Sequence, residues 1–169
     1  MAIADEPILV TNNLYLGNFN AAEYARLIKN NISAVVCLTK YSHDYISNLA
    51  KDNPEQNQQI TLLHINNIGE DLAAETFTLD KLLKAISFIN SQTKLNKNVL
   101  VHCKAGASRS PTVIIGYLMQ KFDLNVAEAC LFLKQKAYYI NPTFISLLEE
   151  YYKFLQSRPG TDASEELYG

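Results

Sequence analysis

Apolar residues recur along the chain in two spacings that predict two kinds of element. Short apolar runs bounded by turn residues are typical of buried strands, and apolar residues three and four apart are typical of one face of a helix. The first pattern predicts a hairpin around Asn12–Asn13 and three further strands, with strand residues at 8–11, 14–16, 32–38, 59–64 and 99–102. The second pattern predicts helices at residues 21–29, 77–90, 110–121, 126–137 and 142–156.

Strands that alternate with helices predict an α/β fold with a mainly parallel central sheet flanked by helices. In such a sheet, ligand sites lie beyond the carboxyl ends of the strands. The polar stretch at residues 39–58 separates two of the predicted strands and predicts only a short helix at residues 42–50. The chain has no internal repeat, and we expect one folded domain at residues 8–156, followed by a polar, mobile tail at residues 157–169.

Composition and charge narrow the classes of function. The chain has 169 residues, 48% of them hydrophobic, which suits one domain with a sizeable core. A formal net charge of −2 gives no general attraction to nucleic acid, and no apolar run approaches the length of a membrane span. The three cysteines are too few for a disulfide scaffold and have no metal-ligand spacing. We therefore expect a reducing, cytoplasmic or nuclear location and no metal or organic cofactor.

The strongest chemical signal lies where the predicted strand at residues 99–102 meets the predicted helix at residues 110–121. Between Cys103, at the end of the strand, and Arg109, at the start of the helix, stand five residues. A loop of this length lets backbone N–H groups converge on one point, and the helix dipole adds to a nest for a dianion such as phosphate. The same field stabilises a thiolate, so we expect Cys103 to be a nucleophile near neutral pH. Arg109 can hold two phosphoryl oxygens with its planar guanidinium.

This string, HCKAGASRSPT at residues 102–112, resembles the signature of the Cys-based protein phosphatases, and most of all that of the dual-specificity phosphatases. The string LYLGN at residues 14–18 also resembles the start of that domain, and the resemblance covers residues 14–155. It implies a small, atypical enzyme that hydrolyses phosphotyrosine and phosphoserine or phosphothreonine in partner proteins through a phosphocysteine on Cys103, without a cofactor. It also implies that the phosphate is bound by Lys104, Ala105, Gly106, Ala107, Ser108 and Arg109.

In this family a carboxylic acid on the loop after the strand at residues 59–64 protonates the leaving group, and Asp71 fits that position. Glu70 is the competing candidate. The alternative interpretation of Asp71 is a solvated loop charge or a helix-capping residue.

Ser110 and His102 flank the central pair in the sequence and have two interpretations each. The hydroxyl of Ser110 is expected to bond the sulfur of Cys103 and assist departure of the thiolate, or to cap the helix, with Pro111 in its first turn. His102 points away from Cys103 if the strand alternates, which favours a buried ring that hydrogen-bonds loop backbone over a protease-like base.

Two other classes of function stay open from the sequence. Lys104 is shared with lipid-phosphatase relatives, in which basic loop residues bind inositol or glycerol phosphates, but the second loop cation common in those relatives is replaced by Ala107 and Ser108. A non-catalytic phosphate-binding module is the other alternative, although such modules usually lack the nucleophile or the arginine.

Cys37 lies near the end of the predicted strand at residues 32–38, at the same edge of a parallel sheet as Cys103. Some Cys-based phosphatases have a second cysteine on the matching strand, which implies a Cys37–Cys103 disulfide that protects an oxidised nucleophile. Cys130, within a later helix, is the weaker partner. The competing interpretation is that Cys37 is a small buried apolar residue.

Overall fold

The computed structural model describes residues 5–40, 60–66, 68, 77–104, 106–137 and 144–158. Its centre is a five-stranded sheet with the strand order β1-β2-β5-β3-β4. Only β1 runs antiparallel to its neighbour, and the other three pairings are parallel. The α/β fold with a mainly parallel sheet is thus confirmed, as is the hairpin. The strands are β1 (Ile8–Thr11), β2 (Leu14–Gly17), β3 (Ile32–Cys37), β4 (Thr61–His64) and β5 (Asn98–His102).

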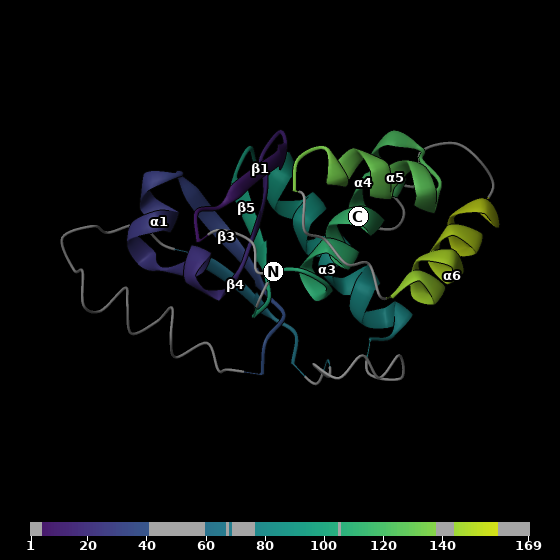
Figure 1. Ribbon diagram of the computed structural model, residues 1–169, viewed down its shortest axis with the longest axis horizontal. Helices are drawn as coiled ribbons and strands as arrows, with labels where there is room; N and C mark the ends of the chain where they lie inside the picture. Colours follow the sequence, from purple (N-terminus) through teal and green to yellow (C-terminus); the bar gives the residue numbers. More distant parts are fainter. Residues whose placement is uncertain are drawn as a thin grey trace.

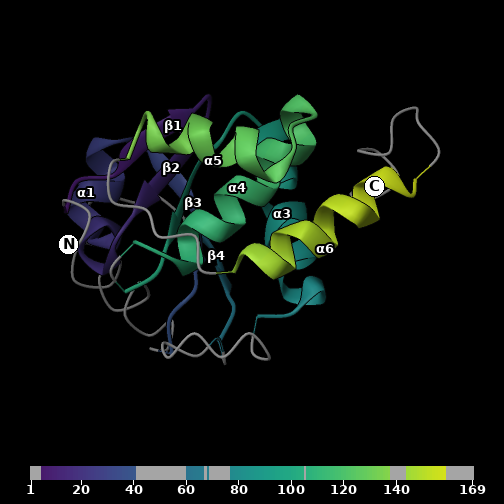
Figure 2. The same cartoon turned by 45° about the vertical axis from the view of Figure 1, so that its right-hand side comes forward.

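Helices cover both faces of the sheet and give three layers (Figure 1). A short 3-10 helix and α1 pack on one face, and four longer helices pack on the other, as the turned view in Figure 2 also shows. The elements are the 3-10 helix η1 (Phe19–Ala22), α1 (Tyr24–Lys29), α3 (Leu79–Lys94), α4 (Arg109–Phe122), α5 (Val126–Lys134) and α6 (Ile145–Gln156). The predicted helix at residues 42–50 and nearly all of the predicted tail lie outside the described residues.

Local capping explains where the observed helices depart from the predicted ones. The segment predicted as one helix at residues 21–29 is divided, because the side chain of Asn18 caps η1 and the extended backbone of Glu23 separates η1 from α1. The helix predicted at residues 77–90 begins at Leu79, after Thr78 accepts a hydrogen bond from the backbone of Lys81. Periodicity locates the apolar face of a helix, whereas the capping residue sets its end.

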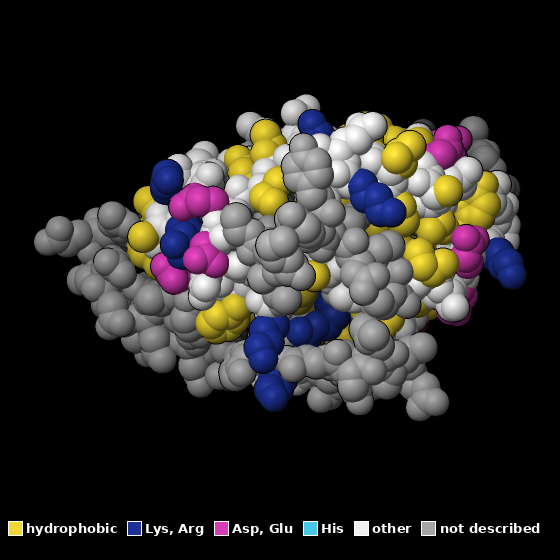
Figure 3. Space-filling view, in the orientation of Figure 1, with side chains coloured by type: hydrophobic (Ala, Val, Ile, Leu, Met, Phe, Trp, Pro, Cys, Tyr) yellow, Lys and Arg dark blue, Asp and Glu magenta, His cyan; other side chains and the backbone are white. Residues whose placement is uncertain are grey.

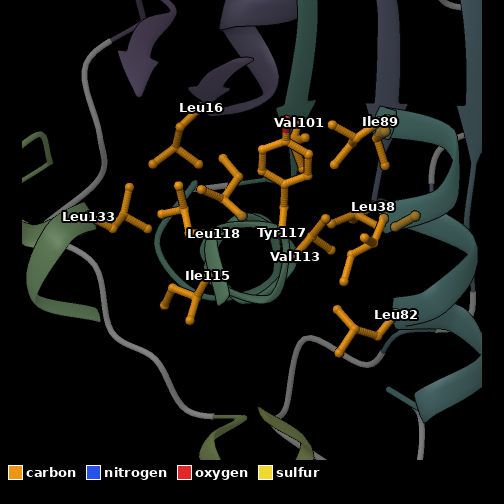
Figure 4. Packing of buried hydrophobic residues seen from close by; sticks show 14 of the residues in the cluster. Leu16, Leu38, Leu82, Ile89, Val101, Val113, Ile115, Tyr117, Leu118 and Leu133 are labelled. Carbon is orange, nitrogen blue, oxygen red and sulfur yellow. The ribbon is translucent and has the colours of Figure 1, made fainter. Parts of the chain in front are cut away.

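Helix α4 is the centre of the larger core. All of its residues from Arg109 to Met119 are buried, so only its last turn, with Lys121 and Phe122, is exposed to water. Figure 4 shows the helix nearly end-on, with Val113, Ile115, Tyr117 and Leu118 directed outward in different directions. They meet the apolar face of the sheet and the inner faces of the neighbouring helices, represented by Leu16, Val101, Leu82, Ile89 and Leu133. The packing therefore fixes α4, and with it the loop that joins β5 to α4.

Candidate active site

The loop between β5 and α4 joins two of the most deeply buried elements of the domain. Cys103 directly follows the last residue of β5, and Arg109 is the first residue of α4. Both side chains are buried: Cys103 is 2% exposed and Arg109 is 7% exposed. The carboxyl end of a parallel strand and the amino end of a helix thus meet at one place, where the orphan N–H groups of the helix favour an anion.

The sulfur of Cys103 has two hydrogen-bonding neighbours inside this loop. The backbone N–H of Gly106 donates to Sγ at 3.2 Å, and the hydroxyl of Ser110 lies 3.2 Å from the same atom. A sulfur in this position can accept a hydrogen bond from each of these two groups. The sulfur atom is therefore held in a polar cradle although the residue is buried.

Ser110 does not cap α4, which corrects one of its two interpretations. The N-cap residue is Ser108, and Ser110 is the second residue of the helix. The carbonyl of Ser108 accepts from both the backbone N–H and the hydroxyl of Thr112, at 3.1 and 2.7 Å. Because the helix begins one residue earlier than the sequence indicates, the Ser110 hydroxyl faces Cys103. Pro111 is in the first turn, where its missing N–H costs no helical hydrogen bond.

The guanidinium of Arg109 is anchored to the neighbouring strand. Its Nη1 donates to the backbone carbonyl of Leu38, directly after β3, at 2.9 Å. A guanidinium has five N–H donors in one plane, so this bond fixes the orientation of that plane, whose fork geometry suits phosphoryl oxygens. Sequence reasoning identified Arg109 but not Leu38, because the contact depends on β3 lying next to β5.

Gly106 occupies a backbone conformation that other residues rarely adopt. Its φ is +72°, and a Cβ there would lie 2.9 Å from the carbonyl oxygen of Gly17 and 3.1 Å from the nitrogen of Asn18. The loop therefore packs closely against backbone at the end of β2, and glycine is required for both reasons. The LYLGN string pointed to Gly17, but only the parallel pairing of β2 with β5 places it beside the loop.

We expect Gly106→Ala to lower kcat/KM on an aryl phosphate strongly and to lower the melting temperature only slightly. The left-handed backbone costs a non-glycine residue about 1–2 kcal/mol, and the added methyl group must displace the loop from Gly17. Because Gly106 donates to the Cys103 sulfur, displacement separates that donor from the nucleophile. The measurement is kcat/KM on an aryl phosphate together with the melting temperature. Full activity in a folded variant would contradict this account of the loop.

His102 is buried on the opposite side of the strand from Cys103. Burial lowers the pKa of its imidazole to about 4, so the ring is neutral near pH 7. Its Nδ1 lies 3.3 Å from the backbone carbonyl of Cys103, to which it donates, and the edge of the Phe19 ring packs against it. The geometry suits a residue that orients loop backbone.

Cys37 is at the end of β3, paired in register with His102. The thiol of Cys37 contacts the hydroxyl of Thr39 at 3.3 Å, and burial raises the pKa of that thiol. Cys103 packs instead with the core around α4, and both thiols are free. A disulfide between the two therefore stays a prediction, and it requires Cys103 to leave Ser110. Cys130, also a free thiol, lies on α5.

The remaining predicted site residues are only partly placed. Lys104 is exposed, Ala107 and Ser108 are half-buried in the loop, and Ala105, Glu70 and Asp71 lie outside the described residues. Figure 3 shows Lys and Arg side chains gathered just below the centre of the face that is turned to the viewer in Figure 1.

Within the described ranges, no group of three His, Cys, Asp or Glu side chains is arranged to hold a metal ion. In the same ranges, no helix is long and apolar enough to cross a bilayer.

A buried cysteine, a left-handed glycine and a buried arginine on a loop between β5 and α4 define the class of the Cys-based phosphatases. The family model described as "Dual specificity phosphatase, catalytic domain" matches residues 14–154. The chain belongs to this family, and it is a protein phosphatase domain.

Two relatives and one solved structure give the range of similarity. Protein 123R of Invertebrate iridescent virus 6, whose name carries the term tyrosine phosphatase, is 32% identical over 90% of this chain and 96% of its own length. Human dual specificity protein phosphatase 9 is 33% identical over 83% of this chain, which spans only 34% of that protein. The crystal structure of human DUSP28 has the same fold, with a TM-score of 0.75 and 23% identity over 92% of this chain and 99% of that one.

Proposed function

We propose that this domain hydrolyses phosphotyrosine and phosphoserine or phosphothreonine in proteins through a phosphocysteine on Cys103. The observation that carries the proposal is the cradle around the sulfur, in which the Gly106 amide and the Ser110 hydroxyl each lie 3.2 Å from Sγ. The buried guanidinium of Arg109, anchored to the Leu38 carbonyl, is the group that would bind the phosphoryl oxygens. A phosphate-binding module needs the arginine and the amides, but it has no use for a stabilised sulfur anion.

In the first step the thiolate of Cys103 attacks phosphorus, the S–P bond forms and the P–O bond to the leaving group breaks. Negative charge builds on the equatorial phosphoryl oxygens. The amides of the loop and the guanidinium of Arg109, oriented by the Leu38 carbonyl, stabilise that charge. Asp71 gives its proton to the departing oxygen, so that an alcohol or phenol leaves rather than an anion.

In the second step water attacks the phosphocysteine, and the Asp71 carboxylate accepts a proton from that water. The S–P bond breaks, inorganic phosphate forms and the electron pair returns to sulfur. The Ser110 hydroxyl, 3.2 Å from Sγ, donates to the departing thiolate, as does the Gly106 amide. The same two donors therefore serve the nucleophile at the start and the leaving group at the end.

Asp71→Asn is expected to slow hydrolysis of substrates with poor leaving groups by about 10²- to 10⁴-fold, the usual contribution of a general acid. Activated aryl phosphates should lose much less, because their leaving groups need little protonation. The measurement is kcat for alkyl and aryl phosphates of graded leaving-group pKa. Glu70→Gln is the matched control, and the assignment is wrong if the leaving-group-dependent loss follows Glu70 instead.

The substrate class is tested by comparing kcat/KM on phosphotyrosine peptides, phosphoserine and phosphothreonine peptides, and phosphoinositides in one assay. The proposal expects turnover of both peptide classes. Exclusive turnover of phosphoinositides would assign the basic Lys104 to a lipid phosphatase, and absence of any turnover, of an aryl phosphate included, would leave a binding module. A Cys103→Ser protein on a phosphopeptide array would then identify the preferred sequences.

A further inference from the structure

The backbone that follows β2 lies directly against the phosphate-binding loop. We refer to residues 17–19 as the β2 corner. The N–H of Phe19 donates to the carbonyl of Lys104 at 3.0 Å. A Cβ added to Gly106 would lie only 2.9 Å from the carbonyl oxygen of Gly17. The β2 corner thus contacts the loop at two points, one on each side of Ala105.

Both contacts bear on how the loop binds an anion. When successive N–H groups turn inward to one point, the carbonyls between them must turn outward, and each outward carbonyl needs a donor from the protein or from water. Phe19 supplies that donor to Lys104. Two residues further along the loop, the Gly106 N–H is directed at the Cys103 sulfur. A β2 corner in another position would leave the loop free to turn its amides away.

The β2 corner is itself held by the side chain of Asn18, which is only 6% exposed. Its Oδ1 accepts from the N–H of Ala21 at 3.0 Å, which starts η1 and sets the direction of the Phe19 N–H. Its Nδ2 donates to Oδ1 of Asp5 at 2.9 Å, and the exposed Asn20 donates to the same oxygen at 3.1 Å. These hydrogen bonds lower the pKa of Asp5, so its carboxyl group is charged near neutral pH.

We propose that Asn18 and Asp5 are positioning residues for catalysis, which hold the β2 corner so that the phosphate loop keeps its amides directed inward. Neither side chain contacts the reacting atoms, and the effect passes through the backbone of Phe19 and Gly17. The inference rests on the proposed function, because it concerns the same loop. It gives a catalytic consequence to two residues that lie 85 (Asn18) and 98 (Asp5) positions before the nucleophile in sequence.

The test exchanges donor and acceptor between the two side chains. Asn18→Asp keeps the acceptor for Ala21 but directs a carboxylate at the carboxylate of Asp5. Adding Asp5→Asn restores one amide and one carboxylate in reversed order, with an acceptor still available to Asn20. The matched control is Asn20→Asp, which adds the same charge beside Asp5 on an exposed side chain that does not hold the β2 corner. The readouts are kcat on an aryl phosphate, the dissociation constant of inorganic phosphate from an NMR titration, and the melting temperature.

We expect kcat and phosphate affinity each to fall about ten-fold in Asn18→Asp, the factor that matches loss of one hydrogen bond to a charged group. The double variant should recover most of both, and Asn20→Asp should resemble the wild type. Should Asn18→Asp fail to fold, Asp5→Ala replaces it, because it removes only the exposed partner and leaves the cap on Ala21. Its kcat and phosphate affinity should fall together.

Three results would overturn the inference: a lower melting temperature with unchanged phosphate affinity, an equal loss in Asn20→Asp, or no recovery in the double variant. If Asp5→Ala replaces the single variant, unchanged phosphate affinity would overturn it too. Because phosphate affinity is measured without turnover, it separates this inference from the proposed function. A wild-type protein that binds phosphate but hydrolyses no phosphoprotein would refute the proposed function, and the Asn18 and Asp5 variants would still decide the role of the β2 corner.

Discussion

Cys103→Ser is expected to lower kcat by more than about 10⁴-fold, the scale of loss when a covalent nucleophile is removed. A serine hydroxyl in the same cradle is far less ionised than a thiol, so the attacking anion is lost. The Gly106 amide and the Arg109 guanidinium are unchanged, and the negative charge of the thiolate is gone. Phosphate binding should therefore be retained or become tighter. The measurements are single-turnover hydrolysis of an aryl phosphate and a phosphate titration.

Cys130→Ser is the matched control for this substitution. Cys130 is also buried, but it lies on α5, where its side chain packs in the hydrophobic core. This variant should keep its turnover number once it is folded. Hydrolysis by Cys103→Ser at even a few per cent of the wild-type rate would remove Cys103 from the role of nucleophile.

Arg109→Lys is expected to lower kcat/KM by about 10³-fold although the charge is retained. The guanidinium donates to the Leu38 carbonyl at 2.9 Å, which orients its planar fork of N–H groups for phosphoryl oxygens. An ammonium on a flexible stem cannot hold two oxygens in a fixed geometry while also bonding that carbonyl. Steady-state kinetics on an aryl phosphate measure the effect, at a temperature where circular dichroism shows both proteins folded.

Arg158→Lys gives the same change of side chain away from the loop. There the guanidinium stacks on the ring of Phe154 at the end of α6, and activity should be unchanged. Near-normal kcat/KM in Arg109→Lys would mean that Arg109 does not hold the phosphoryl group.

The sequence predicted the chemical core of the site because that core is local. Cys103, Gly106, Arg109 and Ser110 lie within one strand–loop–helix unit, whose spacing follows from the loop alone. The fold class was equally accessible, since a buried helix such as α4 and a buried strand such as β5 have patterns of their own. The hairpin of β1 and β2 was predictable from its turn pair.

The contacts that support the site were not predictable, because they depend on which strands become neighbours and in what register. Leu38 and Phe19 reach the loop only because β3 and β2 flank β5. Both act through backbone atoms, so their residue types give no sign of the role. The cap of Asn18 and the early start of α4 at Arg109 are settled by single hydrogen bonds, which periodicity does not resolve.

The burial of α4 on all sides from Arg109 to Met119 restricts how a domain of this kind could diversify. Its first turn has Arg109 and Ser110, and the turns that follow fill the core shared by the sheet and the neighbouring helices. A change that moved the helix to suit a new substrate would also disturb the packing that makes the chain fold. Divergence in substrate choice is therefore confined to positions outside this helix, such as the exposed Lys104. The same helix holds Arg109 and Ser110 and fills the hydrophobic core, so the site and the core constrain each other in sequence.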